Sequence, residues 1–279
     1  MAGNNSNENK RAYNPKRSAD WNYGGKNWKL SRSKIDFFKE CPRCFYIDNK
    51  YGVARPKMPA FTLNVAVDAL LKKEFDTHRV GQTAHPLMKK YGVEAIPFSY
   101  PEIDAWRENF VGIQYRHEET GMLITGAIDD VWVNPAGELI VVDYKATSKD
   151  GKLDSLDDSS WKEQYQRQLE VYQWLLRQKG FKVSSTGYFV YVNGQKDRAA
   201  FDGKLEFEIT LIPHTGDDSW VEKTLLNIKK CLDDKRCPLP SKTCEFCAYR
   251  LAMHDALVTA KGEGETKTSG KDPEKKTLF

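Results

Sequence analysis

GAIDDVWVNPAGELIVVDYKATS, residues 126–148, is the stretch of sequence that decides the fold. Two apolar runs, about 122–133 and 138–146, have the composition of β-strands, and residues 134–137 between them are typical of a tight turn. The stretch therefore predicts a β-hairpin. Its second strand is unusual, because the apolar run Leu-Ile-Val-Val ends in the carboxylate of Asp143.

The register of this hairpin brings three charged side chains together. Paired positions sum to about 271 or 272, so Asp129 lies opposite Val142 or Asp143, at about 5 Å. Side chains alternate between the two faces of a strand, so Asp143 shares its face with Lys145. By the same alternation, Asp130 points to the face opposite Asp129. Two carboxylates and one ammonium thus converge from neighbouring strands.

Two carboxylates that close in a partly buried site repel each other unless a cation holds them. Mg²⁺ suits that position, because it prefers carboxylate and water oxygens and bridges to phosphate. It lowers the pKa of a bound water and stabilises charge on a phosphodiester, while Lys145 orients the water or stabilises the reacting phosphorus. The alternative is an ordinary hairpin with Asp and Lys exposed at its strand ends. The apolar strand and the opposed Asp129 favour a hydrolytic site for nucleic acid.

A long helix predicted at about 160–179 supplies two further polar side chains. Gln168 and Tyr172 are four residues apart, so they share one face of the helix. On a helix that flanks the site, this amide and phenol can hydrogen-bond a phosphate or order the ligands of the metal. The alternative is a tyrosine packed in the core with the glutamine at its rim.

The remaining pattern predicts an α/β fold, a mixed sheet covered by helices. We expect further helices from Ser31 to Pro42, at 63–75 and at 218–232, strands at 111–118, 184–193 and 204–212, and a last short helix after a cysteine-rich loop. The composition of residues 1–27 and 261–279 predicts disordered tails, which leaves one domain at 28–260.

The composition of the chain bears on its compartment and partners. No apolar run among the 279 residues is long enough to span a membrane, and the N-terminus lacks the apolar centre of a secretory signal. We therefore expect a cytoplasmic protein, whose six cysteines are thiols or metal ligands rather than disulfides. Of the net charge of +4, residues 1–27 carry +3 and residues 261–279 carry +1. The neutral body between them argues against a surface-wide clamp for duplex DNA and leaves room for a local basic groove.

The motifs, taken in order, resemble the PD-(D/E)XK nuclease superfamily, in particular its RecB-like branch. The resemblance rests on LSRSKIDFFKECPRCFY, GAID, VVDYK and QRQLEVY, and covers roughly residues 30–250. It implies a restriction-endonuclease-like core and cleavage of DNA that depends on Mg²⁺ or Mn²⁺. In this resemblance Asp129 and Asp143 hold the metal. The supporting catalytic residues are Lys145, Gln168 and Tyr172.

Two more metal ligands are implied by the resemblance alone. The backbone carbonyl of Tyr144 is expected to join the oxygen ligands of the metal. Many RecB-like enzymes also place a histidine on an early helix, and in this chain Asp68 takes that position. An oxygen ligand suits Mg²⁺. The alternative for Asp68 is a surface side chain on an amphipathic helix.

Five of the cysteines are spaced like metal ligands. Cys41 and Cys44 form one C-x2-C pair, and Cys237 precedes a second pair, Cys244 and Cys247. The resemblance implies a [4Fe–4S] cluster held by Cys41, Cys237, Cys244 and Cys247. A zinc site on the two C-x2-C pairs and buried thiols without metal are the alternatives. Either metal would be structural, holding the end of the domain to its first helix.

The sequence as a whole predicts a Mg²⁺-dependent deoxyribonuclease that acts in DNA repair, recombination or defence. DNA is the expected substrate, and a helicase or other DNA-processing protein is the expected kind of partner. The alternative is a catalytically inactive DNA-binding or assembly module with the same fold. Intact Asp129, Asp143 and Lys145 argue against that alternative, because a chain without catalysis has no reason to bury such charges.

Overall fold

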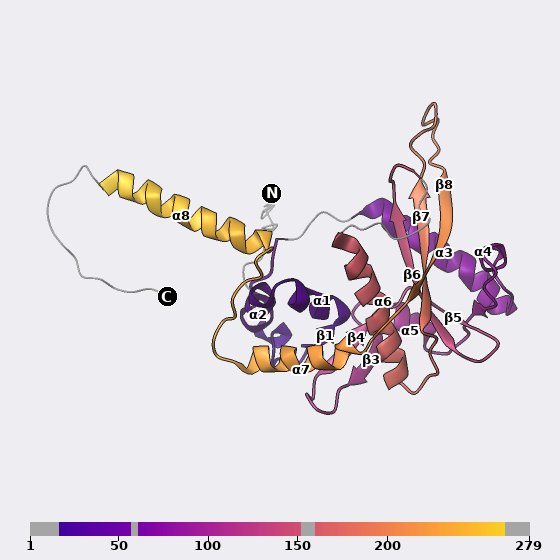
Figure 1. Cartoon of the computed structure of the whole chain (residues 1–279), viewed down its shortest axis with the longest axis horizontal. Coiled ribbons are helices and arrows are strands. Elements are labelled where there is room, and N and C mark those ends of the chain that lie inside the picture. Colours follow the sequence, from indigo (N-terminus) through magenta and orange to yellow (C-terminus); the bar gives the residue numbers. More distant parts are fainter. Residues whose placement is uncertain (1–16, 57–60, 152–159, 266–279) are drawn as a thin grey trace, which may run out of the picture.

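A computed structural model gives the fold of residues 17–56, 61–151 and 160–265 (Figure 1). Its helices are α1 (Arg32–Glu40), α2 (Pro42–Tyr51), α3 (Thr62–Gly81), α4 (Pro86–Lys90), α5 (Ile103–Arg107), α6 (Ser160–Gln178), α7 (Trp220–Asp233) and α8 (Glu245–Glu265), with a 3-10 turn at Ala19–Trp21. Its strands are β1 (Leu30–Ser31), β2 (Ile96–Pro97), β3 (Ile113–Arg116), β4 (Leu123–Gly126), β5 (Asp130–Val133), β6 (Leu139–Thr147), β7 (Thr186–Gly194) and β8 (Phe207–Thr215). Each helix and strand expected from the sequence has a counterpart here.

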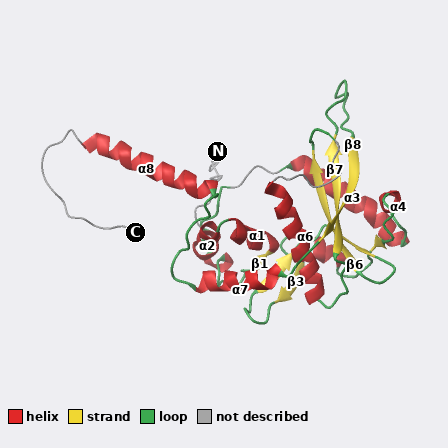
Figure 2. Cartoon of the chain, viewed as in Figure 1, coloured by secondary structure: helices red, strands yellow, loops and turns green. Residues whose placement is uncertain are grey.

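The strands of the described ranges form two sheets. The larger sheet has the order β2-β5-β6-β7-β8, with β6 and β7 parallel and the other pairs antiparallel. The smaller sheet has the order β1-β4-β3. Helix α6 follows β6 and precedes its parallel neighbour β7, and it runs between the sheet and the helices α1 and α2 (Figure 2). This mixed sheet flanked by helices is the α/β, restriction-endonuclease-like fold that the sequence predicts.

Strand β6 is buried on both faces, which explains its continuous apolar run. Leu139 and Val141 belong to the core cluster that includes α6. Ile140 and Val142 belong to a second cluster on the other face, with residues of α3. The alternation continues to Asp143, which therefore points to the same side of the sheet as Val141 and α6.

The hairpin has the predicted turn and register. Asn134 N–H donates to the Glu138 carbonyl, and Gly137 adopts a φ of 74° that favours glycine. Asp130 pairs with Val142, a sum of 272, so continuation of the ladder sets Asp129 opposite Asp143.

The first strand, however, is not continuous over 122–133. It divides into β4, which belongs to the small sheet, and β5, which belongs to the large one. A close approach of backbones accompanies the break, because a Cβ on Gly112 would lie 2.5 Å from the Gly126 carbonyl oxygen. Asp129 lies in the break, just before β5 begins.

The boundaries expected for the two tails differ from the structure where it describes them. Residues 17–27 contain the 3-10 turn, and Arg17 N–H groups donate to Asp48 of α2, so ordered structure begins before residue 28. Helix α8 is not short but continues to Glu265, and it extends away from the rest of the chain (Figure 1). Residues 1–16 and 266–279 lie outside the described part of the chain.

None of the described helices is both long and apolar enough to cross a membrane.

Candidate active site

Asp143 and Lys145 form the centre of the site, on the half of β6 nearest its C-terminal end. Asp143 has no exposed side-chain surface, and Lys145 Nζ donates to its Oδ2. Burial raises the pKa of Asp143 to about 7, although Lys145 opposes the rise. Burial lowers the pKa of Lys145, but the charges of Asp143 and Asp129 and the hydrogen bond to Asp143 together outweigh it, so that this pKa lies above its ordinary value. The lysine therefore stays charged beside a carboxylate that lacks water.

Asp129 approaches this pair from the break before β5. Its side chain is 24% exposed, and its Oδ2 accepts a hydrogen bond of 2.9 Å from the backbone N–H of Tyr144. Its charge contributes to the raised pKa of Asp143. The structure thus brings Asp129, Asp143 and Lys145 together, as the hairpin register predicts, and Asp129 is the most exposed of the three.

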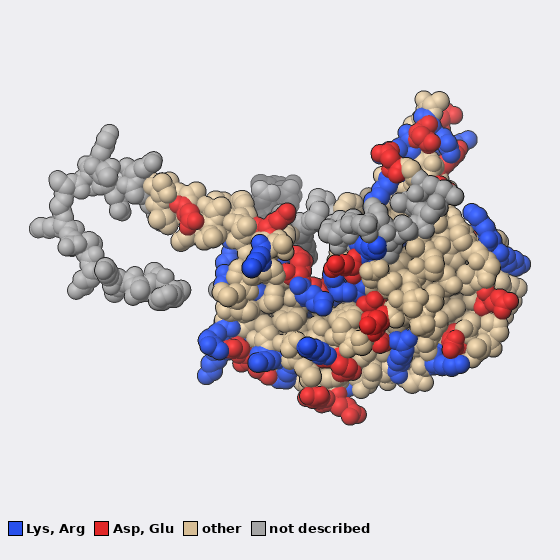
Figure 3. All heavy atoms as spheres, viewed as in Figure 1, with Lys and Arg blue, Asp and Glu red and all other residues tan. Residues whose placement is uncertain are grey.

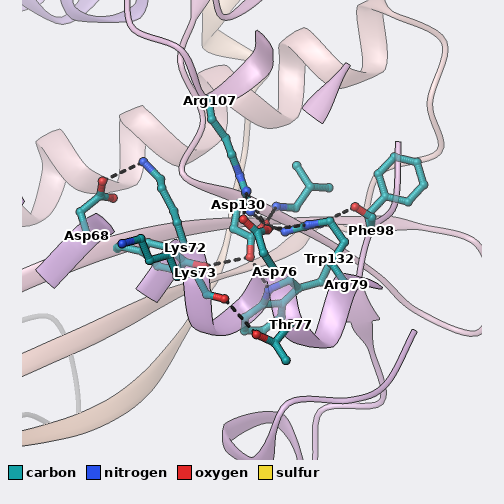
Figure 4. A network of polar contacts seen from close by, with 12 residues as sticks. Asp68, Lys72, Lys73, Asp76, Thr77, Arg79, Phe98, Arg107, Asp130 and Trp132 are labelled. Carbon is teal, nitrogen blue, oxygen red and sulfur yellow. Dashed lines mark hydrogen bonds and ion pairs between the residues drawn. The ribbon is translucent and has the colours of Figure 1, made fainter. Parts of the chain in front are cut away.

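Helix α3 adds Asp68 and a lysine that the sequence argument did not include. Lys72 Nζ lies 2.8 Å from Asp68 Oδ2 and 3.8 Å from Asp129 Oδ1, so one ammonium sits between two carboxylates (Figure 4 shows the Asp68–Lys72 pair). Burial raises the pKa of Asp68, with Lys72 opposing the rise and Asp129 adding to it. Asp68 and Lys72 are four residues apart on one helix, a spacing that brings side chains together, so this pair could have been predicted from the sequence.

Gln168 and Tyr172 reach the site from α6. Gln168 Nε2 donates to Asp143 Oδ1 over 2.7 Å and to the Tyr172 hydroxyl oxygen over 3.3 Å. Gln168 thus contacts the carboxylate itself. Tyr172 is buried in the core cluster, and its ring packs so close to β4 that a Cβ on Gly126 would lie 2.7 Å from it. Tyr172 is both a core residue and part of the polar group at the site.

Arg32, at the first position of α1, is a further cation of the site that the sequence did not mark. Burial lowers its pKa, but the nearby Tyr172 and Asp143 outweigh this, so the net shift is upward. Its Nε is buried without a hydrogen-bond partner among the described residues. In the sequence, Arg32 is simply the residue that follows the helix cap Ser31, and nothing in that context indicates a role at the site.

A pocket of about 780 Å³ opens beside Asp129. Gln168 and Tyr172 line one side, and the aromatic side chains of Trp21 and Phe110 lie on its rim, the latter 90% exposed. Its lining carries one acidic residue, Asp129, and five basic ones: Arg17, Lys26, Lys29, Arg32 and Lys34. On the face shown in Figure 3, several basic side chains lie at a central hollow with acidic side chains beside them, and both signs of charge are interspersed elsewhere. The pocket itself favours an anionic, partly aromatic ligand.

On the opposite face of β5, Asp130 closes a buried network of ion pairs (Figure 4). Arg79 and Arg107 both donate to its Oδ1, the latter over 2.8 Å, and both arginines also pair with Asp76. The Tyr144 hydroxyl donates to Asp130 Oδ2 over 2.8 Å. This network joins α3 to β5 and β6, and so holds the helix that carries Asp68 against the strands that carry the other carboxylates.

Four cysteines meet at a separate place, where α8 begins beside α1 and α2. The Sγ atoms of Cys41, Cys44, Cys244 and Cys247 all lie within 4.8 Å of one another. Cys237 is exposed and contacts only the neighbouring Pro238 carbonyl, at 3.8 Å, among the described residues. Among the described residues, the structure therefore does not bring Cys237 into this group and brings Cys44 into it instead. The structure brings together the two C-x2-C pairs.

Comparison with known proteins gives one informative match. The family model of the PD-(D/E)XK nuclease superfamily matches residues 92–252, which include β5, β6 and α6. No curated protein matches the chain. One solved structure, described as "Crystal structure of SSO0001", is 15% identical over 80% of this chain and 84% of that chain, with a TM-score of 0.40.

Proposed function

This chain belongs to the PD-(D/E)XK nuclease superfamily, and we propose that it is a metal-dependent deoxyribonuclease of the RecB-like branch. The observation that carries the proposal is the meeting of Asp129, Asp143, Lys145 and Gln168 on one side of β6, beside a basic pocket. Its role would be in DNA repair, recombination or defence, within the cytoplasm.

The oxygen atoms at the site suit Mg²⁺ or Mn²⁺. Asp129 and Asp143 supply carboxylates from two neighbouring strands, and Asp68 supplies a third from α3. The Tyr144 carbonyl is the proposed fourth oxygen. Such oxygens are the ligands that these ions prefer. The ammonium of Lys72, which contacts both Asp68 and Asp129, supports the fit, because the two carboxylates together attract positive charge. When bound, the metal supplies an activated water and stabilises charge on the phosphate.

Lys145 has the charge and the position to act on the reacting phosphate. Its side chain is 15% exposed, and its ammonium lies 4.7 Å from the centre of the Tyr165 ring and 3.4 Å from Gln168 Oε1. These contacts fix the ammonium beside Asp143, where it can hold the attacking water or stabilise negative charge on the phosphate oxygens. Gln168 orients the Asp143 carboxylate, and Tyr172 in turn accepts a hydrogen bond from Gln168.

The basic pocket supports a nucleic acid strand as the substrate. Phosphates next to the cleaved bond would lie against Lys29, Arg32 and Lys34, with bases stacked on Phe110 or Trp21. The body of the protein is otherwise close to neutral, so a helicase or other DNA-processing partner would add affinity by delivering the strand.

One assay tests the proposal directly. The purified full chain is incubated with Mg²⁺ or Mn²⁺ and end-labelled DNA, in linear and circular and in single- and double-stranded forms. We expect cleavage of at least one form, its loss with EDTA, and its loss in the Asp143→Asn variant. DNA binding without cleavage by the metal-loaded wild type would contradict the proposal and favour an inactive binding module.

The pocket has its own test with a matched control. Phe110→Ala should weaken binding of a labelled oligonucleotide in EDTA about tenfold, because base stacking on an aromatic ring is lost. Phe201, also in a loop and 73% exposed, lies outside the pocket lining, and Phe201→Ala should bind like the wild type. Equal affinities of the wild type and both variants would show that the DNA strand does not bind in this pocket.

A further inference from the structure

We propose that Cys41, Cys44, Cys244 and Cys247 bind one Zn²⁺ as a tetrahedral tetrathiolate, with Arg55 as the cation that offsets its charge. The site replaces the iron–sulfur cluster that the resemblance implies. It lies outside the candidate active site and does not depend on the proposed nuclease activity.

The distances between the sulfur atoms favour zinc over an iron–sulfur cluster. The Sγ–Sγ separations are 3.9 Å for Cys41–Cys247, 3.7 Å for Cys44–Cys244 and 3.4 Å for Cys44–Cys247. A zinc–sulfur bond of about 2.3 Å gives a tetrahedron whose sulfur atoms lie about 3.8 Å apart. One zinc ion therefore fits between these four atoms.

An iron–sulfur cubane does not fit the same four atoms. Its irons occupy separate corners, and each thiolate extends outward from its own iron. The thiolate sulfurs of a cubane therefore lie much farther apart than those around a single ion. Sulfur atoms that all lie within 4.8 Å of one another leave no room for four irons and four sulfides. Cys237, which the cluster would need, is exposed and outside this group.

Arg55 is placed to compensate the charge of such a site. Four thiolates and one Zn²⁺ carry a net charge of −2, and three of the four cysteines are buried. Arg55 Nη2 lies 3.3 Å from Cys244 Sγ. Its guanidinium is held between the rings of Phe37 and Phe246, at 4.6 and 4.3 Å from their centres. A fixed cation at hydrogen-bond distance stabilises a thiolate ligand and so strengthens metal binding.

The site joins parts of the chain that are distant in sequence. Cys41 and Cys44 lie at the junction of α1 and α2, whereas Cys244 and Cys247 lie at the start of α8. Helix α1 begins with Arg32, which lines the candidate active site. Bound zinc thus holds α8 to the helix that carries one wall of the pocket.

Metal analysis of the full chain decides between the metals. The protein is purified under anaerobic conditions from cells supplied with both zinc and iron. We expect one zinc per chain, no acid-labile sulfide and no visible absorption, and exchange with Co²⁺ should produce the visible bands of a tetrahedral cobalt thiolate. Brown protein that contains iron and sulfide would overturn the proposal, as would wild-type protein without bound metal.

Variants then test the ligand set and the cation. Cys44→Ser should lose the zinc, whereas Cys237→Ser, as the matched control, should retain one zinc per chain. Arg55→Gln should retain the metal but bind it about 10–100-fold more weakly in competition with a chromogenic chelator. Zinc loss in Cys237→Ser would overturn the ligand set, and wild-type affinity in Arg55→Gln would overturn the role of the arginine. The stoichiometry in the wild type tests the site even where Cys44→Ser does not fold.

Discussion

Asp129 and Asp130 are neighbours in the chain, but the structure treats their charges in opposite ways. Asp130 is fully buried and accepts from Arg79 and Arg107, so its charge is neutralised within the fold. Asp129, on the other face, is 24% exposed, and the nearest cation to it among the described residues is Lys72, at 3.8 Å. One charge is satisfied by the protein, whereas the other is left for a ligand.

The difference separates a charge that is neutralised within the fold from one that we propose binds a metal. A buried carboxylate with two arginines and three further donors has no capacity left for a metal. A carboxylate that accepts one backbone hydrogen bond and faces a pocket keeps the rest of its lone pairs available. The charge is the same in both aspartates, so it is the exposure and the number of protein donors that distinguish Asp129 from Asp130.

The largest effect is expected for activity at Asp129. Asp129→Asn removes a proposed metal ligand and should lower DNA cleavage by about 10³-fold or more. The free energy of unfolding should change by less than about 1 kcal/mol, because Lys72, the ion-pair partner of Asp129 among the described residues, lies 3.8 Å away and both side chains are partly exposed. Cleavage rates with Mg²⁺ and urea denaturation of the same preparation measure both quantities. A variant that cuts at the wild-type rate would contradict the assignment.

Asp130 should show the reverse pattern. Asp130→Ala leaves Arg79 and Arg107 buried without their carboxylate, and should destabilise the protein by about 3–5 kcal/mol. Asp76 pairs with the same two arginines but is 41% exposed, so Asp76→Ala should cost about 1 kcal/mol. Urea denaturation compares the two variants. Equal losses would show that the network is not centred on Asp130.

Two glutamines of α6 extend the comparison. Gln168→Ala should slow cleavage about 10–100-fold with little loss of stability, because Gln168 orients Asp143. Gln173 Nε2 donates to the Ser184 and Ser185 carbonyls instead, so Gln173→Ala should cost about 1–3 kcal/mol of stability and leave turnover of the folded protein unchanged. If both variants lose stability and neither loses turnover per folded molecule, Gln168 is a packing residue.

The smallest effect is expected for Lys72. Because its ammonium lies between Asp68 and Asp129, Lys72→Gln should tighten Mn²⁺ binding several-fold, or by about 1 kcal/mol. Lys73, the neighbouring lysine of α3, is exposed, and Lys73→Gln should bind Mn²⁺ like the wild type. Titration calorimetry measures both affinities. If Lys72→Gln binds Mn²⁺ with the wild-type affinity, then displacing the Lys72 ammonium from the two carboxylates costs no free energy.

Local pattern predicted the hairpin and much of the site. The turn and alternation were enough to set Asp129 opposite Asp143, because a hairpin register depends on neighbouring residues only. The break between β4 and β5 was not predictable from the same stretch, since it depends on the close approach of Gly112, which is distant in sequence. Arg32 was not predicted for the same reason, because its role arises from contacts between distant elements. Cys44 was predicted only in the zinc alternative, and the contact of Lys72 with Asp129 joins a helix to a distant strand.

The parallel pairing of β6 with β7 has a consequence for the order in which the protein folds. The β5–β6 hairpin closes over a short turn, so it can form early and with Asp143 still hydrated. Val142 meets Tyr188 only after the chain has crossed over through α6, and such long-range pairing is slow. We therefore expect the Asp143 carboxylate to lose its water late, near the end of folding. We expect divalent ions present during refolding to speed that last step, because they offset the repulsion that it creates.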